Sequence, residues 1–127
     1  MFLYYDHYIA DISFDSSIGI GGNKWPAADL FCSFITAPAL HRQLQPLFKN
    51  KKCIELGSGC GLAGIIIEKA FDPLQVVMTD IGSYITLIKS NIEANNLSKS
   101  YATVYDWNSE PDQLSSLKFD VVLALEW

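Results

Sequence analysis

The sequence "CIELGSGCGLAG", residues 53–64, decides the fold of this 127-residue chain. The apolar segment Lys52–Leu56 is typical of a buried strand, and it runs directly into glycines at every second position. A helical pattern follows over Leu62–Phe71. Glycine reaches positive φ and lets a ligand approach the backbone. A strand, glycine turn and helix in this order therefore commonly hold part of a nucleotide-like cofactor.

Strand and helix patterns alternate after this unit. They predict strands over residues 75–79, 101–105 and 119–125, a helix over 83–95, and a weak helix or loop over 111–117. Strands this apolar, separated by helices, favour a parallel sheet that is covered on both faces. The predicted fold class is therefore α/β, a Rossmann-like doubly wound parallel sheet whose ligands bind beyond the carboxyl ends of its strands.

The amino-terminal part carries a different pattern. Alternating apolar residues over Tyr8–Phe14 predict a strand, and the glycine-rich stretch at 16–26 predicts a turn or a short second strand. Residues 1–24 are thus expected to form a β-hairpin or strand extension. A helix is expected to begin at Pro26 and to end or kink at Pro38. Its expected buried stripe consists of Leu30, Phe31, Phe34 and Ile35.

The amino-acid composition limits the classes of protein to which this chain can belong. Half of the residues are apolar, which is enough for a single domain, 1–127, with its own core. The net charge of −5 disfavours nucleic acid as a partner and suits a cationic protein surface. No apolar run approaches the roughly 20 residues of a membrane span, so no membrane contact is expected. The three cysteines lack metal-type spacing, which favours no metal site and reduced thiols in a cytoplasmic protein, with the nucleus as the alternative.

The sequence stops two residues after its most apolar strand, 119–125. A strand of this composition is typical of the middle of a sheet, and its second edge needs cover. We therefore expect a partial domain, incomplete after the fourth core strand: a fragment, a truncated product, or one half of a complex in which a partner chain covers that edge.

Two classes of cofactor compete for the glycine turn. The dinucleotide fingerprint G-x-G-x-x-G/A, read from Gly57, places the large Leu62 at its last position, although a reading from Gly59 survives loosely. Glu55, two residues before the first glycine, would repel a pyrophosphate. A carboxylate suits S-adenosylmethionine better, because that cofactor carries an ammonium and a sulfonium and no phosphate. A plain turn without a ligand is disfavoured, since alternating glycines cost backbone entropy.

Further candidate residues follow the next strands. Asp80 ends the second strand of the unit, where a carboxylate can accept both hydrogen bonds of a ribose diol; its alternative role is to precede a helix. Asp106 and Trp107 end the third strand, where an indole can stack on adenine and an acid can accept from its amino group, or where both belong to the core. Trp25 is either a cofactor contact or a hydrophobic staple.

These motifs together resemble the seven-strand S-adenosylmethionine-dependent methyltransferases, and within them the protein-lysine methyltransferases of methyltransferase family 16. The matching segments, in the family's order, are residues 25–28 ("WPAA"), 55–64 ("ELGSGCGLAG"), 79–80 ("TD"), 91–95 ("NIEAN"), Trp107 and 120–126 ("DVVLALE").

The resemblance implies an S-adenosyl-L-methionine cofactor and a protein substrate that carries a lysine. The cofactor contacts that it implies are Trp25, Gly57, Ser58, Gly59, Asp80, Trp107 and Leu125. Leu125 stands where the family usually has a small residue. Glu126 stands where the family's acidic D-x-x-Y motif begins, so it is the candidate catalytic residue and would orient the substrate amine. The alternatives are a non-catalytic cofactor-binding or interaction fragment and, less favoured, a nicotinamide-dependent dehydrogenase.

Overall fold

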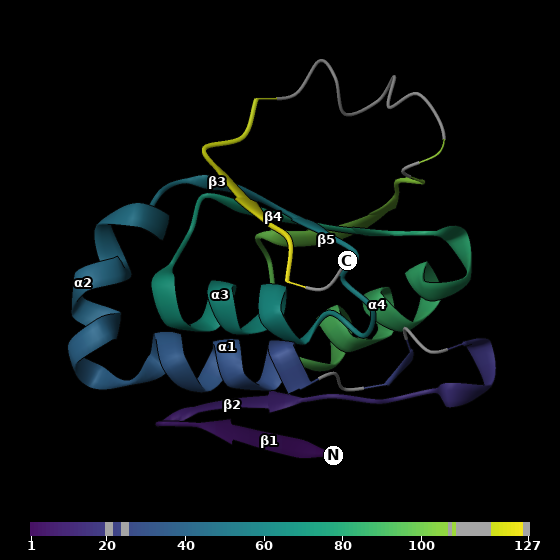
Figure 1. Ribbon diagram of the computed structural model, residues 1–127, viewed down its shortest axis with the longest axis horizontal. Coiled ribbons are helices and arrows are strands. Elements are labelled where there is room, and N and C mark those ends of the chain that lie inside the picture. The colour runs from purple at the N-terminus through teal and green to yellow at the C-terminus, as the bar shows by residue number, and fades with distance from the viewer. Residues whose placement is uncertain (20–21, 24–25, 107, 109–117, 126–127) are drawn as a thin grey trace.

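The computed structural model describes residues 1–19, 22–23, 26–106, 108 and 118–125. Its elements, in chain order, are β1 (Phe2–Tyr5), β2 (Tyr8–Asp11), a 3₁₀ turn (Ser16–Ile18), α1 (Pro26–Thr36), α2 (Pro38–Phe48), β3 (Lys52–Leu56), α3 (Leu62–Phe71), β4 (Gln75–Asp80), α4 (Gly82–Ala94), β5 (Ser100–Val104) and β6 (Val121–Leu123). Figure 1 shows them as stacked layers, with the sheet above the helices and the β1–β2 hairpin on the far side of α1.

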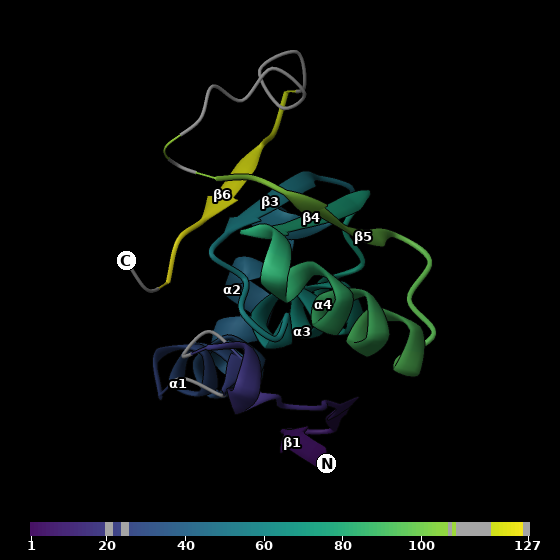
Figure 2. The same cartoon turned by 90° about the vertical axis from the view of Figure 1, so that its right-hand side faces the viewer.

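The central sheet is parallel and has the strand order β5-β4-β3-β6. The register pairs Cys53 with both Val76 and Val121 across the two neighbours of β3. Helices α3 and α4 pack against one face of this sheet, and α1 packs on the other side of α3 (Figures 1 and 2). The α/β, Rossmann-like class with an amino-terminal hairpin is therefore confirmed.

Helix α3 forms the centre of the core. It lies between the sheet and the layer of α1 and β2, so almost every side of it is buried. This position explains why its sequence is apolar all round rather than amphipathic. Gly64 allows the close approach to β4, because a Cβ there would lie 2.8 Å from the Met78 side chain.

The two faces of the sheet differ in the elements that pack against them. The sequence predicts helices on both faces, but the helices of the described ranges all lie on one (Figure 2). On the opposite face Ile54 and Val77 are buried, whereas Val122 is 62% exposed. The strand predicted over 119–125 is present, but the predictions of its length and of its full burial are wrong, because β6 has three residues and Val122 on it is exposed. Within the described residues β6 has β3 as its one neighbour, so its second edge is uncovered there. The helix or loop predicted over 111–117 lies outside the described residues.

The hairpin partner of β2 precedes it in the chain. β1 pairs with β2 in antiparallel register, Phe2 opposite Asp11, and the stretch at 16–18 is a 3₁₀ turn rather than a strand. The connection between the strands is short, and Asp6 adopts a left-handed φ of 55° there, as tight hairpin turns require. Sequence reasoning missed β1 because its four residues are nearly all apolar and do not alternate.

The predicted helix after Pro26 is correct, and its predicted buried face is correct in part, because Ile35 is buried and Phe31 packs against the core. Leu30 and Phe34 are 69% and 66% exposed, while Cys32 and Ile35 are buried. Helix α1 packs against α3 through a narrower side than the apolar pattern indicates. Pro38 follows the end of α1 and is the first residue of α2, where proline is well suited. The sequence analysis did not predict this second helix.

Candidate functional site

The glycine turn joins the carboxyl end of β3 to the start of α3. Gly57, Gly59 and Gly61 have φ of 69°, 58° and 91°, in the left-handed region that favours glycine. The Ser58 amide donates to the carbonyl of Thr79 at 2.8 Å, and the Gly61 amide donates to the carbonyl of Ser58 at 2.8 Å. The alternating glycines are therefore a requirement of this turn, which hydrogen bonds fix against the end of β4.

Asp80 brings the second half of the site to this turn. One carboxylate oxygen, Oδ2, accepts from the Gly59 amide at 2.8 Å, and Oδ1 accepts from the Ile81 amide at 2.7 Å. A carboxylate oxygen has two lone pairs, so each keeps one for a further donor. The structure thus places Gly57, Ser58, Gly59 and Asp80 together at the carboxyl ends of two neighbouring parallel strands, where ligands of such folds bind.

Glu55 lies beneath the turn and is 3% exposed. Its Oε1 has no hydrogen-bond partner in the described residues. Burial raises the pKa of Glu55 to about 7, and the Asp80 charge adds to the rise, while hydrogen bonds from Ser58 and the Gly64 backbone act in the opposite direction. A buried carboxyl with an unused oxygen fits a cationic group, such as the ammonium of S-adenosylmethionine.

The remaining predicted site residues divide into two groups. Leu125 is half-buried against the core and follows β6, so it also lies beyond the carboxyl end of a strand. Trp25, Trp107 and Glu126 lie outside the described residues. Asp106 follows β5, and its Oδ1 accepts from the Asn108 amide at 2.9 Å.

Sequence reasoning missed two residues beside the turn. Thr79 is fully buried and its Oγ1 donates to the Glu55 carbonyl at 2.7 Å, which ties β4 to β3 at the base of the turn. Ile81 follows Asp80 and is 45% exposed, an apolar surface at the mouth of the site. An apolar residue directly after a strand-ending acid is the signal by which Ile81 is recognisable.

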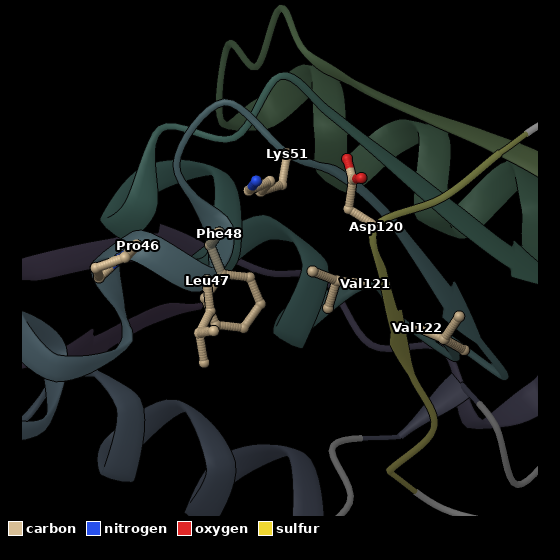
Figure 3. A pocket seen from close by; sticks show the side chains of 7 residues that line it. All are labelled: Pro46, Leu47, Phe48, Lys51, Asp120, Val121 and Val122. Carbon is tan, nitrogen blue, oxygen red and sulfur yellow. The ribbon is translucent and has the colours of Figure 1, made fainter.

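A pocket of about 580 Å³ lies at the other end of the sheet (Figure 3). It is lined by the end of α2, by the residue before β3 and by the start of β6 with the residue before it. The lining residues are Pro46, Leu47, Phe48, Lys51, Asp120, Val121 and Val122. Lys51 and Asp120 precede strands, so this pocket lies at the amino ends of β3 and β6. Parallel sheets bind their ligands at the opposite ends, and we therefore assign the candidate cofactor site to the glycine turn.

The described part of the chain shows neither a metal-type cluster nor a membrane-spanning helix. In that part of the chain no three His, Cys, Asp or Glu side chains gather as a metal site would need. No helix there has the length and apolar character needed to cross a membrane.

The conformation of the turn predicts a contrast between two glycines. Alanine at Gly61 is expected to destabilise the fold by about 2 kcal/mol, because φ is +91° and the added Cβ meets Ile88 and Met78 at 3.3 Å. Alanine at Gly82 meets nothing within 4 Å and begins α4, so it is expected to stabilise by about 0.5 kcal/mol. Urea unfolding measures both; equal stabilities of the two variants would contradict the assigned turn.

Known proteins are similar to this chain in sequence. A family model described as lysine methyltransferase matches residues 6–126. Protein-lysine N-methyltransferase EFM6 of Saccharomyces cerevisiae is 34% identical over 102 residues, which are 73% of this chain and 42% of that protein. Calmodulin-lysine N-methyltransferase of Arabidopsis thaliana is 35% identical over 109 residues, 80% of this chain and 33% of that protein. The chain thus spans less than half the length of these relatives.

Solved structures share the fold. Protein-L-isoaspartate O-methyltransferase superposes with a TM-score of 0.54 at 17% identity, over 76% of this chain and 28% of that one. The Trypanosoma brucei PRMT1 enzyme–prozyme complex with AdoHcy gives 0.50 at 21% identity, over 66% of this chain and 27% of that one. The resemblance drawn from the motifs is confirmed by the family match, which covers nearly the whole chain: this protein belongs to the lysine methyltransferase family.

Proposed function

We propose that this chain is the cofactor-binding part of an S-adenosylmethionine-dependent methyltransferase that modifies lysine side chains of a protein. One observation carries the proposal: Asp80 accepts from the Gly59 amide at 2.8 Å, at the rim where a left-handed glycine turn meets two parallel strands. The buried Glu55, whose Oε1 has no hydrogen-bond partner among the described residues, supports a ligand with a positive amino-acid end. A pyrophosphate would meet two carboxylates here and be repelled.

Each residue of the proposed site has a separate task. The backbone of Gly57–Gly59 admits the amino-acid end of the cofactor, and Glu55 offsets the charge of its ammonium. The free lone pairs of Asp80 accept from the ribose hydroxyls. The proposed walls of the adenosine pocket are Trp25, Trp107 and Leu125. When bound, S-adenosylmethionine supplies an activated methyl group on a sulfonium, so alignment and exclusion of water are the main tasks of the protein.

The substrate side is proposed from Glu126. A lysine amine reacts in its neutral form, and its unperturbed pKa is about 10.4. A dry pocket lowers that pKa, and a carboxylate at Glu126 would orient the amine. The name of the Arabidopsis thaliana relative gives calmodulin as its target, and that of a Xenopus tropicalis relative, EEF1A lysine methyltransferase 3, gives EEF1A. For this chain we propose only a protein lysine, on a partner whose positive surface complements the net charge of −5.

The proposed location is the cytoplasm, with the nucleus as the alternative. Its support is the state of the cysteines: Cys32, Cys53 and Cys60 are buried and in the reduced thiol form. Burial raises the pKa of Cys53 to about 11, which keeps this thiol protonated and unreactive at neutral pH.

Calorimetric titration of the chain with S-adenosylhomocysteine tests the cofactor, and transfer of a radiolabelled methyl group to proteins of a cell extract tests the reaction. We expect binding at one site, and label on protein that survives nuclease but not protease. NAD⁺ in place of S-adenosylhomocysteine is the matched control. Binding of NAD⁺ alone would overturn the proposal in favour of a dehydrogenase.

A second candidate is a cofactor-binding module without transfer activity. Within the described ranges β6 has β3 as its neighbour, and Val122 on β6 is 62% exposed. An open edge of this kind is a surface that a partner chain covers. Binding of S-adenosylhomocysteine together with absence of methyl transfer, by the same two measurements, would favour this candidate.

A further inference from the structure

Asn91, on α4, is a buried amide that joins two distant parts of the chain. It is 1% exposed. Its Oδ1 accepts from the Ser13 amide at 2.8 Å, and its Nδ2 donates to the Ser13 carbonyl at 3.0 Å and to the Cys60 carbonyl at 2.8 Å. Ser13 follows the amino-terminal hairpin and Cys60 belongs to the glycine turn. One side chain therefore holds both segments with every donor in use.

Asn95, one helical turn later, makes a parallel set of bonds with a different reach. Its Oδ1 accepts from the Asp11 amide at 2.9 Å, and its Nδ2 donates to the Asp11 carbonyl at 2.8 Å and to the Asn91 carbonyl at 2.7 Å. Residues four apart lie on one face of a helix. The two amides thus satisfy the backbone at positions 11 and 13 much as a neighbouring strand would, but Asn91 alone of the two reaches the glycine turn.

The segment after Ser13 continues toward the candidate cofactor site. A Cβ at Gly19 would lie 2.4 Å from the Tyr84 hydroxyl, so the backbone there touches the first turn of α4. Asp11 and Ser13 thus bond Asn95, directly after α4, and Asn91, on α4. Gly19 then lies against Tyr84, near the start of the helix. The segment runs along the helix to its amino end, which directly follows Asp80 and Ile81.

We propose that Asn91 is a positioning residue of the cofactor site, which couples the order of the amino-terminal segment to that of the glycine turn. Loss of this amide would remove one bond to the Cys60 carbonyl and two bonds to the backbone of Ser13, and with them the link that this side chain makes between the two segments. Coupling of this kind is reciprocal: a ligand that orders the turn also orders the segment at Ser13. The inference rests on the proposed binding of S-adenosylmethionine at the turn.

A pair of matched variants tests this role. Asn91→Ala and Asn95→Ala each remove three hydrogen bonds made by one carboxamide. We expect Asn91→Ala to bind S-adenosylhomocysteine about tenfold more weakly than the natural chain. Asn95→Ala is expected to stay within about twofold, because it leaves the bond to Cys60 intact. Calorimetric titration gives both affinities, and thermal unfolding confirms that each variant is folded.

The natural chain provides a test that needs no variant. Saturation with S-adenosylhomocysteine is expected to slow hydrogen exchange of the Ser13 amide about tenfold more than that of the Lys99 amide. Lys99 is a reference for global stabilisation, because its amide donates to Glu68 Oε1 at 3.1 Å, away from the turn.

Two outcomes overturn the inference alone: equal affinities of the two folded variants, or a Ser13 amide that slows no more than Lys99. Failure of the natural chain to bind S-adenosylhomocysteine at all overturns the proposed function, and this inference with it.

Discussion

Replacement of Asp80 by asparagine is expected to weaken binding of S-adenosylhomocysteine about a hundredfold. Both carboxylate oxygens accept from backbone amides, Oδ2 from Gly59 and Oδ1 from Ile81. An asparagine has one oxygen, so in either orientation its NH₂ group faces one of these donors. One of the two backbone amides then loses its acceptor, and the ribose diol loses one charged acceptor, each a charge-assisted interaction of about 1.5–3 kcal/mol.

Asp72→Asn is the matched control for this measurement. It removes the same charge from an exposed residue that pairs with Lys99 at the surface, where ion pairs contribute little. Titration calorimetry is expected to give the control the affinity of the natural chain. An Asp80→Asn chain that binds as tightly as the control would remove Asp80 from the cofactor site.

The second large effect concerns Glu55 and pH. Burial raises the pKa of this carboxyl from 4.5 to about 7. Between these values the folded chain holds a proton that the unfolded chain releases, so the free energy of unfolding falls as pH rises through this window. Above about pH 7 both states have lost the proton, and the full cost of the buried charge, about 3 kcal/mol, is present.

Glu55→Gln is expected to remove this decrease, because glutamine carries no charge at any pH. Urea unfolding of the natural chain and the variant from pH 4 to pH 8 gives the difference, which should grow toward high pH in favour of the variant. Glu93→Gln, at an exposed position on α4, should reproduce the natural profile. Parallel profiles for the natural chain and Glu55→Gln would mean that Glu55 is hydrated in solution.

The strand and helix around the glycine turn were predictable because their signals are local. The bounds Lys52–Leu56 and Leu62–Phe71 agree with the structure, and the strand at 75–79 gains one residue. Glycine adopts the positive φ values of the turn with the least strain, so the spacing of the glycines indicates the backbone conformation. An acid at a strand end has a position that the parallel topology determines, which is why Asp80 was placed correctly beside Gly59.

Elements at the margins of the fold were predicted less well. The apolar stripe of α1 wrongly included Leu30 and Phe34, and the strand after residue 118 was wrongly expected to be buried along its whole length. Apolar composition reports what a segment can bury and does not report which neighbour it meets. Burial of a helix face or a strand depends on the elements that pack against it, and these come from elsewhere in the chain.

The amino-acid sequence by itself determined the α/β class, the glycine turn and the position of an acid beside that turn, since each follows from conformational limits or from topology over a few tens of residues. Tertiary structure alone decided that Asn91 holds Ser13, 78 residues away, together with Cys60, 31 residues away. An asparagine within a helical pattern has no local signal for its partner. Its amide bonds whichever backbone groups packing leaves unpaired beside it, and only the folded arrangement specifies those.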